Sequence, residues 1–229
     1  MKVVAIASRK GGSGKTTLAG HLAVQAEIAG AGPVVLIDID PQGSLAKWWN
    51  LRTRETPYYV QTSLEDLAET VARLRERQVR LLFVDTPPSL DVSVGEVIRC
   101  ADLVLIPSRP SPHDLRSIGA TVKLVEHLGK PLIFVLNGAA PRAKITGEAI
   151  QVLSQHGPLA PSIIHQRVDF AASMVDGRTA MELPGAQRAA EEIVELWRYL
   201  SGRVDGDAPS VELPPLPARN QSTAIFAAE

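Results

Sequence analysis

The chain has 229 residues, and its 45% apolar content can fill the core of one α/β domain. The formal net charge is −1 and Cys100 is the single cysteine, so the sequence excludes a globally basic nucleic-acid binder, a disulfide scaffold and a tetracysteine zinc site. No signal peptide precedes the first apolar run, and no run approaches the roughly 20 residues of a membrane span. We therefore expect a soluble, cytoplasmic protein.

Short apolar runs alternate with longer amphipathic stretches, which is typical of a parallel sheet covered by helices. The predicted strands are 3–7, 34–37, 81–84, 103–106 and 132–136, with a weaker one at 162–164. The predicted helices are 18–29, 64–77, 92–100, 113–128, 146–156 and 185–200. We therefore predict an α/β three-layer sandwich, with a mostly parallel central sheet and helices on both faces.

The composition changes after Ser201 to Asp, Pro, Gly and small polar residues, with Pro214, Pro215 and Pro217 at the centre. Such a segment buries too little apolar surface to offset the entropy of ordering it. We predict a single domain over residues 1–202 and a flexible, proline-rich tail over residues 203–229. A short partner-binding motif within the tail is the alternative to a solvated extension.

A glycine-rich loop joins the first predicted strand to the first predicted helix. Its sequence is Arg9-Lys10-Gly11-Gly12-Ser13-Gly14-Lys15-Thr16-Thr17. Glycines let successive N–H groups converge on one anion, and the helix N-terminus adds partial positive charge. Lys15 is placed for the β- and γ-phosphates, and Thr16 offers a hydroxyl to Mg²⁺. The loop therefore predicts a di- or triphosphate nucleotide with magnesium, against the alternative of a chance glycine-rich turn.

A second lysine distinguishes this loop from the general pattern G-x-x-x-x-G-K-[ST], which would place its first glycine at Arg9. Read with Lys10, the segment resembles the deviant Walker A loop of the ParA/MinD family of ATPases. The resemblance implies a P-loop fold, ATP as the nucleotide and a homodimer in the ATP state. It also implies that Lys10 reaches the phosphates held by the other subunit, so that Lys10 and Lys15 both act in catalysis.

Two carboxylates follow the second predicted strand, in Asp38-Ile39-Asp40-Pro41-Gln42-Gly43. Residues two apart on a strand share a face, and ligands bind at the carboxyl ends of parallel strands. The segment resembles the family's second motif, which implies that Asp40 positions the attacking water and Asp38 supports the magnesium side. A strand end capped by a turn is the alternative.

A third cluster is the apolar strand that ends in Asp85-Thr86-Pro87-Pro88. A carboxylate at the end of a buried strand suits a Walker B position, where it holds Mg²⁺ through water. The two prolines stiffen a loop that resembles the family's switch region. The predicted magnesium residues are thus Thr16, Asp38 and Asp85.

Asn137 follows the predicted strand 132–136, where a Ras-type GTPase would carry Asn-Lys-x-Asp. The acidic residue that reads guanine is absent. The resemblance implies that Asn137 contacts adenine, which favours ATP over GTP. A turn-forming asparagine is an equal alternative.

Missing features narrow the choice within the superfamily. An acidic, proline-rich terminus differs from the basic membrane helix of MinD-like proteins, so we expect no membrane attachment. Cys100 has no paired cysteine for an iron–sulfur cluster, and the tail carries no tyrosine cluster. Residues 106–115 resemble the P-x-x-P-S-x-x-D-L region of ParA-like proteins, and residues 44–49 resemble the small ParF-like members. We expect no N-terminal DNA-reading domain before Met1.

Members of this group bind DNA non-specifically through basic residues late in the chain, and acidic residues interleave the candidates here. These candidates are Arg142, Lys144, Arg167, Arg178 and Arg188. The resemblance implies nucleoid association, a ParB-like or other activating partner, and a cargo such as a plasmid, a chromosome or a protein cluster. The alternatives are a dethiobiotin-synthetase-like metabolic enzyme and a MinD-like positioning ATPase.

Overall fold

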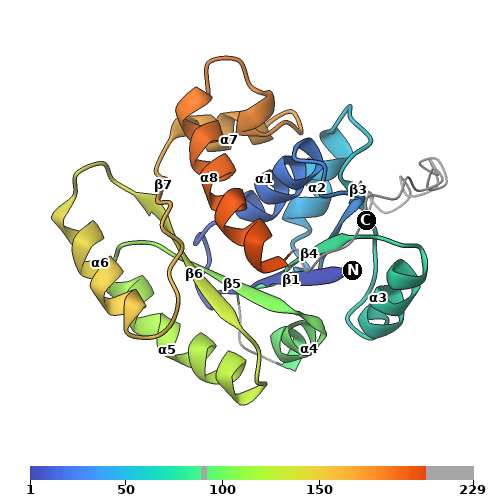
Figure 1. Ribbon diagram of the computed structural model, residues 1–229, viewed down its shortest axis with the longest axis horizontal. Helices are drawn as coiled ribbons and strands as arrows, with labels where there is room; N and C mark the ends of the chain where they lie inside the picture. Colours follow the sequence, from blue (N-terminus) through green and yellow to red (C-terminus); the bar gives the residue numbers. More distant parts are fainter. Residues whose placement is uncertain (89–91, 205–229) are drawn as a thin grey trace.

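A parallel sheet of seven strands forms the centre of the computed structural model, which describes residues 1–88 and 92–204 (Figure 1). The strand order is β3-β2-β4-β1-β5-β6-β7, and each neighbouring pair is parallel. The strands are β1 (Lys2–Ile6), β2 (Val34–Asp38), β3 (Tyr58–Tyr59), β4 (Leu81–Asp85), β5 (Leu103–Ser108), β6 (Leu132–Ala139) and β7 (Ile164–His165).

Helices cover both faces of this sheet (Figure 1). The first face carries α1 (Lys15–Ile28), α2 (Ser44–Leu51), α7 (Val168–Met174), the 3-10 turn η1 (Ala180–Glu182) and α8 (Gln187–Val204). The second face carries α3 (Leu67–Glu76), α4 (Val92–Cys100), α5 (Pro112–His127) and α6 (Lys144–Ser154). The predicted three-layer α/β sandwich is therefore confirmed, and every described strand pair is parallel.

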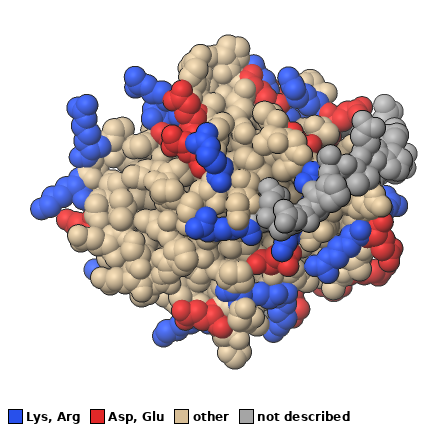
Figure 2. Space-filling view, in the orientation of Figure 1, with Lys and Arg blue, Asp and Glu red and all other residues tan. Residues whose placement is uncertain are grey.

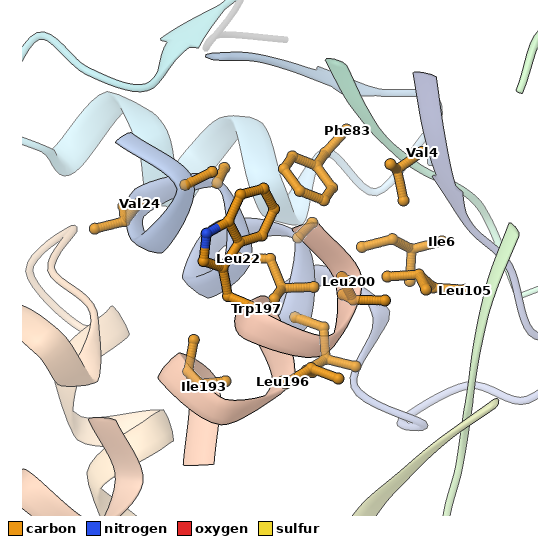
Figure 3. Close-up of a cluster of buried hydrophobic side chains, with 14 of the residues drawn as sticks. Val4, Ile6, Leu22, Val24, Phe83, Leu105, Ile193, Leu196, Trp197 and Leu200 are labelled. Atoms are coloured by element: carbon orange, nitrogen blue, oxygen red, sulfur yellow. The ribbon is translucent and has the colours of Figure 1, made fainter. Parts of the chain in front are cut away.

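The two cores separate along each strand because successive side chains point to opposite faces. In β1, Val4 and Ile6 pack under α1 and α8, whereas Val3 and Ala5 pack against the other layer. Figure 3 shows the first core, where Trp197 of α8 lies among aliphatic side chains from α1 and the sheet. Aliphatic residues on both faces explain why the central strands are continuous apolar runs.

The order of the strands determines which edge of the sheet can form a ligand-binding site. The phosphate loop follows the central strand β1, between the ends of β4 and β5. Loops at the carboxyl ends of the other strands meet along the same edge, which is the usual ligand-binding edge of an open parallel sheet. Helix α8 extends to Val204, two residues into the predicted tail, and residues 205–229 lie outside the described part of the chain.

None of the helices in residues 1–88 and 92–204 combines the length and the apolar character that a membrane span requires.

Candidate functional site

The phosphate loop turns sharply between β1 and α1. Gly12 has φ +73° and Gly14 has φ +95°, both in the left-handed region that favours glycine. Gly14 is also the N-cap of α1, and a Cβ placed there would lie 2.0 Å from Nδ2 of Asn137. Glycine at position 14 therefore satisfies two demands, a left-handed backbone and the close approach of another strand's side chain.

Lys15 is buried at the start of α1 and folds back over the loop. Its Nζ donates to the carbonyl oxygens of Ser8 at 3.3 Å and Lys10 at 3.2 Å. Desolvation by burial lowers the pKa of Lys15, and the nearby charges of Asp85 and Asp40 oppose that shift. The ammonium is thus held inside the loop, where it can exchange carbonyl partners for phosphate oxygens.

Thr16 and Asp85 meet below the loop, as a magnesium site requires. The Thr16 hydroxyl donates to Asp85 Oδ2 at 2.5 Å, and Asp85 is fully buried at the end of β4. Burial raises the pKa of Asp85 to about 7, the Thr16 hydrogen bond opposes that rise, and the charge of Asp38 adds to it. A divalent cation would offset the cost of keeping this carboxylate charged.

The described residues contain no cluster of three His, Cys, Asp or Glu side chains that could hold a metal by themselves. Mg²⁺ commonly keeps several waters and uses one or two protein carboxylates together with substrate phosphates. The Thr16–Asp85 pair therefore fits Mg²⁺ bound together with a nucleotide.

Asp38 and Asp40 have different surroundings at the end of β2. Asp38 Oδ2 accepts the backbone N–H groups of Leu45 at 2.9 Å and Ala46 at 3.1 Å, and its Oδ1 accepts that of Asp40 at 3.0 Å. Asp38 thus holds the first turn of α2, and burial raises its pKa. Asp40 lines the cavity above the phosphate loop.

That cavity has a volume of about 520 Å³, which lies within the usual range for a small-molecule site. It brings together most of the predicted nucleotide residues with the ends of β5, β6 and β7. The predicted residues that line it are Gly11, Gly12, Gly14, Lys15, Thr16, Thr17, Asp40, Asn137 and Arg167.

Asn137 has a structural task that the sequence did not reveal. Its Nδ2 donates to the Ser13 carbonyl oxygen at 2.6 Å, across 124 residues of chain. The buried Ser13 hydroxyl in turn donates to the Lys10 carbonyl oxygen at 3.2 Å. Asn137 therefore braces the phosphate loop from β6, and its contact with adenine stays a prediction.

Lys10 differs from Lys15 in its surroundings. It is half-buried, and among the described residues its ammonium donates to no acceptor and joins no ion pair. It also does not line the cavity that contains Lys15. Such a lysine is available to a group outside its own nucleotide site.

Glu192 of α8 is 9% exposed and accepts hydrogen bonds from two residues that line the cavity. Its Oε1 accepts from His165 Nδ1 at 2.8 Å and from Arg167 Nε and Nη2 at 2.9 and 2.7 Å, while Oε2 accepts the His165 N–H at 2.9 Å. His165 and Arg167 both line the cavity. The pairing with Glu192 raises the pKa of Arg167.

The five predicted DNA-binding residues do not form one group. Arg167 is paired with Glu192, and Arg178 is paired with Asp176 through contacts of 2.7 to 3.0 Å. Arg142, Lys144 and Arg188 are exposed and have no ion-pair partner among the residues that the structure describes. Figure 2 shows Lys and Arg interspersed with Asp and Glu over the visible face.

Arg109, which lines the cavity, and Glu192, which holds two lining residues, have no role in the sequence-based prediction. Arg109 directly follows β5, so its place at a strand end could have indicated the site. Glu192 carries no comparable signal, because its partners lie 25 and 27 residues away and only packing brings them together.

A glycine-rich turn, a buried lysine and a threonine–aspartate pair at the centre of a parallel sheet define the class of P-loop nucleotide-binding proteins. Residues 4–180 match the family described as CobQ/CobB/MinD/ParA nucleotide binding domain, so the chain belongs to that family. The predicted relationship to ParA/MinD proteins is confirmed.

Two similar proteins are each named maintenance of carboxysome distribution protein A. The one from Halothiobacillus neapolitanus is 31% identical over 204 residues, covering 84% of this chain and 93% of its own. The one from Gloeobacter kilaueensis is 34% identical over 218 residues, covering 86% and 96%. An ATP complex of a McdA variant from Cyanothece shares the fold, with a TM-score of 0.70 and 19% identity over 88% of this chain and 96% of that one.

Proposed function

We propose that this protein is a ParA-type ATPase that positions a cargo in the cell. The observation that carries the proposal is that the two lysines of the phosphate loop lie in different places relative to the cavity. Lys15 is buried and lines the nucleotide cavity, whereas Lys10 is half-buried and does not line it. Relatives over most of the chain length, named for carboxysome distribution, support the same reading.

The residues present fit a magnesium nucleotide. The phosphate loop and Lys15 would hold the phosphates, while Thr16 and Asp85 would hold Mg²⁺, which stabilises charge on the transferring phosphoryl group. Asp40 would orient the attacking water, because it follows β2 and its carboxylate lines the cavity, whereas Asp38 does not line it. Asn137 would keep the loop in place and contact adenine.

Lys10 would couple nucleotide binding to dimerisation. Two triphosphates enclosed between two subunits repel each other, and a lysine from each subunit offsets that charge on the other's phosphates. The dimer is therefore expected with ATP and not with ADP.

Size-exclusion chromatography with light scattering tests this coupling. The wild type should dimerise with ATP, Asp40→Ala should accumulate the ATP dimer, and Lys10→Ala should remain monomeric while still binding nucleotide. Arg9→Ala is the matched control, because Arg9 is an exposed cation next to Lys10. A Lys10→Ala protein with normal dimerisation and partner-stimulated turnover would remove the role proposed for Lys10.

DNA binding is expected from the ATP dimer and from exposed, unpaired cations. Arg142 and Lys144 lie at the start of α6, and basic side chains project from the left margin of the molecule around that helix in Figure 2. Dimerisation doubles the patch, and each neutralised phosphate adds salt-dependent affinity. Retention of DNA should require ATP and fall steeply with salt.

A double variant, Arg142→Ala with Lys144→Ala, should weaken DNA retention more than Arg178→Ala, whose guanidinium is already paired with Asp176. Equal losses in the two proteins would contradict the argument from pairing. Retention that ignores the nucleotide would contradict the switch itself.

The cargo class that we favour is a protein assembly, because two named relatives act in carboxysome distribution. A plasmid or a chromosome is the second candidate, because the chromosome-partitioning ATPase Soj of Thermus thermophilus is 26% identical over 190 residues and a virulence plasmid ParA family protein of Chlamydia psittaci is 20% identical over 256 residues. A fluorescent fusion, imaged with and without each neighbouring gene product, distinguishes them by the object that loses its position.

A further inference from the structure

Arg109 brings an additional cation to the nucleotide cavity. It follows β5 directly and lines the cavity together with Gly11 and Gly12 of the phosphate loop. A Cβ placed on Gly138 would lie 3.3 Å from Arg109 Nε and 3.6 Å from its Cγ. The side chain therefore extends from the end of β5 across the bare backbone of Gly138, at the end of β6.

The turn that carries Arg109 is well fixed. The Arg109 carbonyl oxygen accepts the N–H of Ser111 at 2.8 Å and the hydroxyl of Ser108 at 3.2 Å. Ser111 is also the N-cap of α5, where its Oγ accepts the Asp114 N–H at 3.1 Å. Pro110 restricts the backbone between them. A side chain on such a turn can be positioned for a ligand without a large ordering cost.

The guanidinium of Arg109 contrasts with that of Arg167, which lines the same cavity. Arg167 is neutralised by Glu192. Within residues 1–88 and 92–204, the Arg109 guanidinium has no hydrogen-bond acceptor and no ion-pair partner. Of the two arginines that line the cavity, one is therefore already paired and the other has its donors available.

The charged residues along the sheet edge indicate how a nucleotide would be oriented in the cavity. Asp40 follows β2 and Asp85 ends β4, on one side of the phosphate loop, and they would face the γ-phosphate and Mg²⁺. Arg109 follows β5 on the other side, next to Asn137 and Gly138. With the γ-phosphate on the side of Asp40 and Asp85, the remainder of the nucleotide would lie on the side of Arg109.

We propose that Arg109 binds the polyphosphate of the nucleotide in the same subunit, from the side of β5, and contacts phosphates other than the γ-phosphate. This inference rests on the proposed function, because it requires a nucleotide in the cavity. A guanidinium presents a planar fork of donors that matches phosphate oxygens.

The test measures the Kd of the magnesium complex of a fluorescent ADP analogue. ADP is used because it contains only the α- and β-phosphates and does not require the ATP dimer. A hydrogen bond between charged groups contributes about 1.5–3 kcal/mol, so Arg109→Ala should weaken binding about tenfold or more. Arg116→Ala, an exposed arginine on α5, is the matched control and should bind as the wild type does.

Displacement of that analogue by inorganic tripolyphosphate identifies the contacted group, because this probe has no base or ribose. Arg109→Ala should weaken tripolyphosphate by a similar factor, and Arg109→Lys should recover part of the affinity. Thermal unfolding of each variant checks that it is folded.

Three results would overturn the inference: Arg109→Ala binding ADP as well as Arg116→Ala does, a loss confined to ADP with tripolyphosphate unchanged, or Arg109→Lys binding no better than Arg109→Ala. A wild-type protein that binds no magnesium nucleotide would instead refute the proposed function.

Discussion

We expect the folded protein to lose stability in mild acid, because His21 is buried as a neutral ring. It is fully buried in α1, where its Nδ1 donates to the Thr17 carbonyl oxygen at 2.8 Å and its Nε2 accepts the Ala180 N–H at 3.1 Å. These two bonds require the neutral ring. Burial is the largest cause that lowers the pKa of His21 from 6.5 to about 4, and the Thr17 carbonyl opposes the shift.

The sign follows from which state binds the proton. Between pH 6.5 and about 4 the unfolded chain carries a proton on His21 and the folded chain does not, so stability falls as pH falls. At about 1.4 kcal/mol for each pKa unit, the full loss is about 3 kcal/mol, of which about 2 kcal/mol occurs between pH 7 and pH 5.

Urea unfolding at several pH values between 7 and 5 measures this loss. His21→Asn keeps a donor near the Thr17 carbonyl but cannot titrate, so its free energy of unfolding should change less with pH than that of the wild type. His156→Asn, at an exposed histidine, is the control. Parallel pH profiles for the wild type and His21→Asn would refute the argument.

Three further substitutions test other parts of the site. Gly14→Ala forces a strained φ of +95° and a clash with Asn137, which should cost about 1–3 kcal/mol and abolish nucleotide binding in a titration. Arg52→Met leaves the buried Glu182 carboxylate without its 3.0 Å partner and should destabilise the fold by about 3–5 kcal/mol in urea, whereas adding Glu182→Leu should recover part of that loss. Glu192→Gln removes a charge that four N–H donors share, so thermal unfolding should show a loss of about 1–3 kcal/mol and ADP affinity should fall.

The sequence was most informative where a function depends on consecutive residues. The phosphate loop, the strand ends at Asp38 and Asp85, and the parallel sheet were all predictable, because each depends on spacing within a few residues. Helix α1 begins at Lys15, three residues before the predicted start, because Gly14 already provides its N-cap. Boundaries of this kind depend on backbone geometry that apolar periodicity does not encode.

Short elements and long-range contacts were not predictable. The two-residue strand β3 and the seven-residue helix α7 are too short for a periodic pattern. The last strand is at Ile164–His165 rather than 162–164, because these are the residues that pair with Asn137 and Ala139 of β6. The apolar residues of helix α2 gave some indication of a helix. The sequence did not show that Trp48 donates to the Arg178 carbonyl oxygen, 130 residues away.

Three carboxylates lie at the carboxyl edge of the sheet, and they differ in the hydrogen-bond donors that surround them. Asp38 has both oxygens bound to backbone N–H groups of the Asp40 turn and α2, and it does not line the cavity. Asp85 is bound by Thr16 and by the Thr86 N–H, below the phosphate loop. Asp40 lines the cavity, and among the described residues only its Oδ1 accepts a hydrogen bond, from the Gln42 N–H. A carboxylate that lines the cavity and has one oxygen without a protein donor can orient a water molecule there. Geometry therefore favours Asp40 over Asp38 for that role, and Asp38 holds the turn on which Asp40 lies.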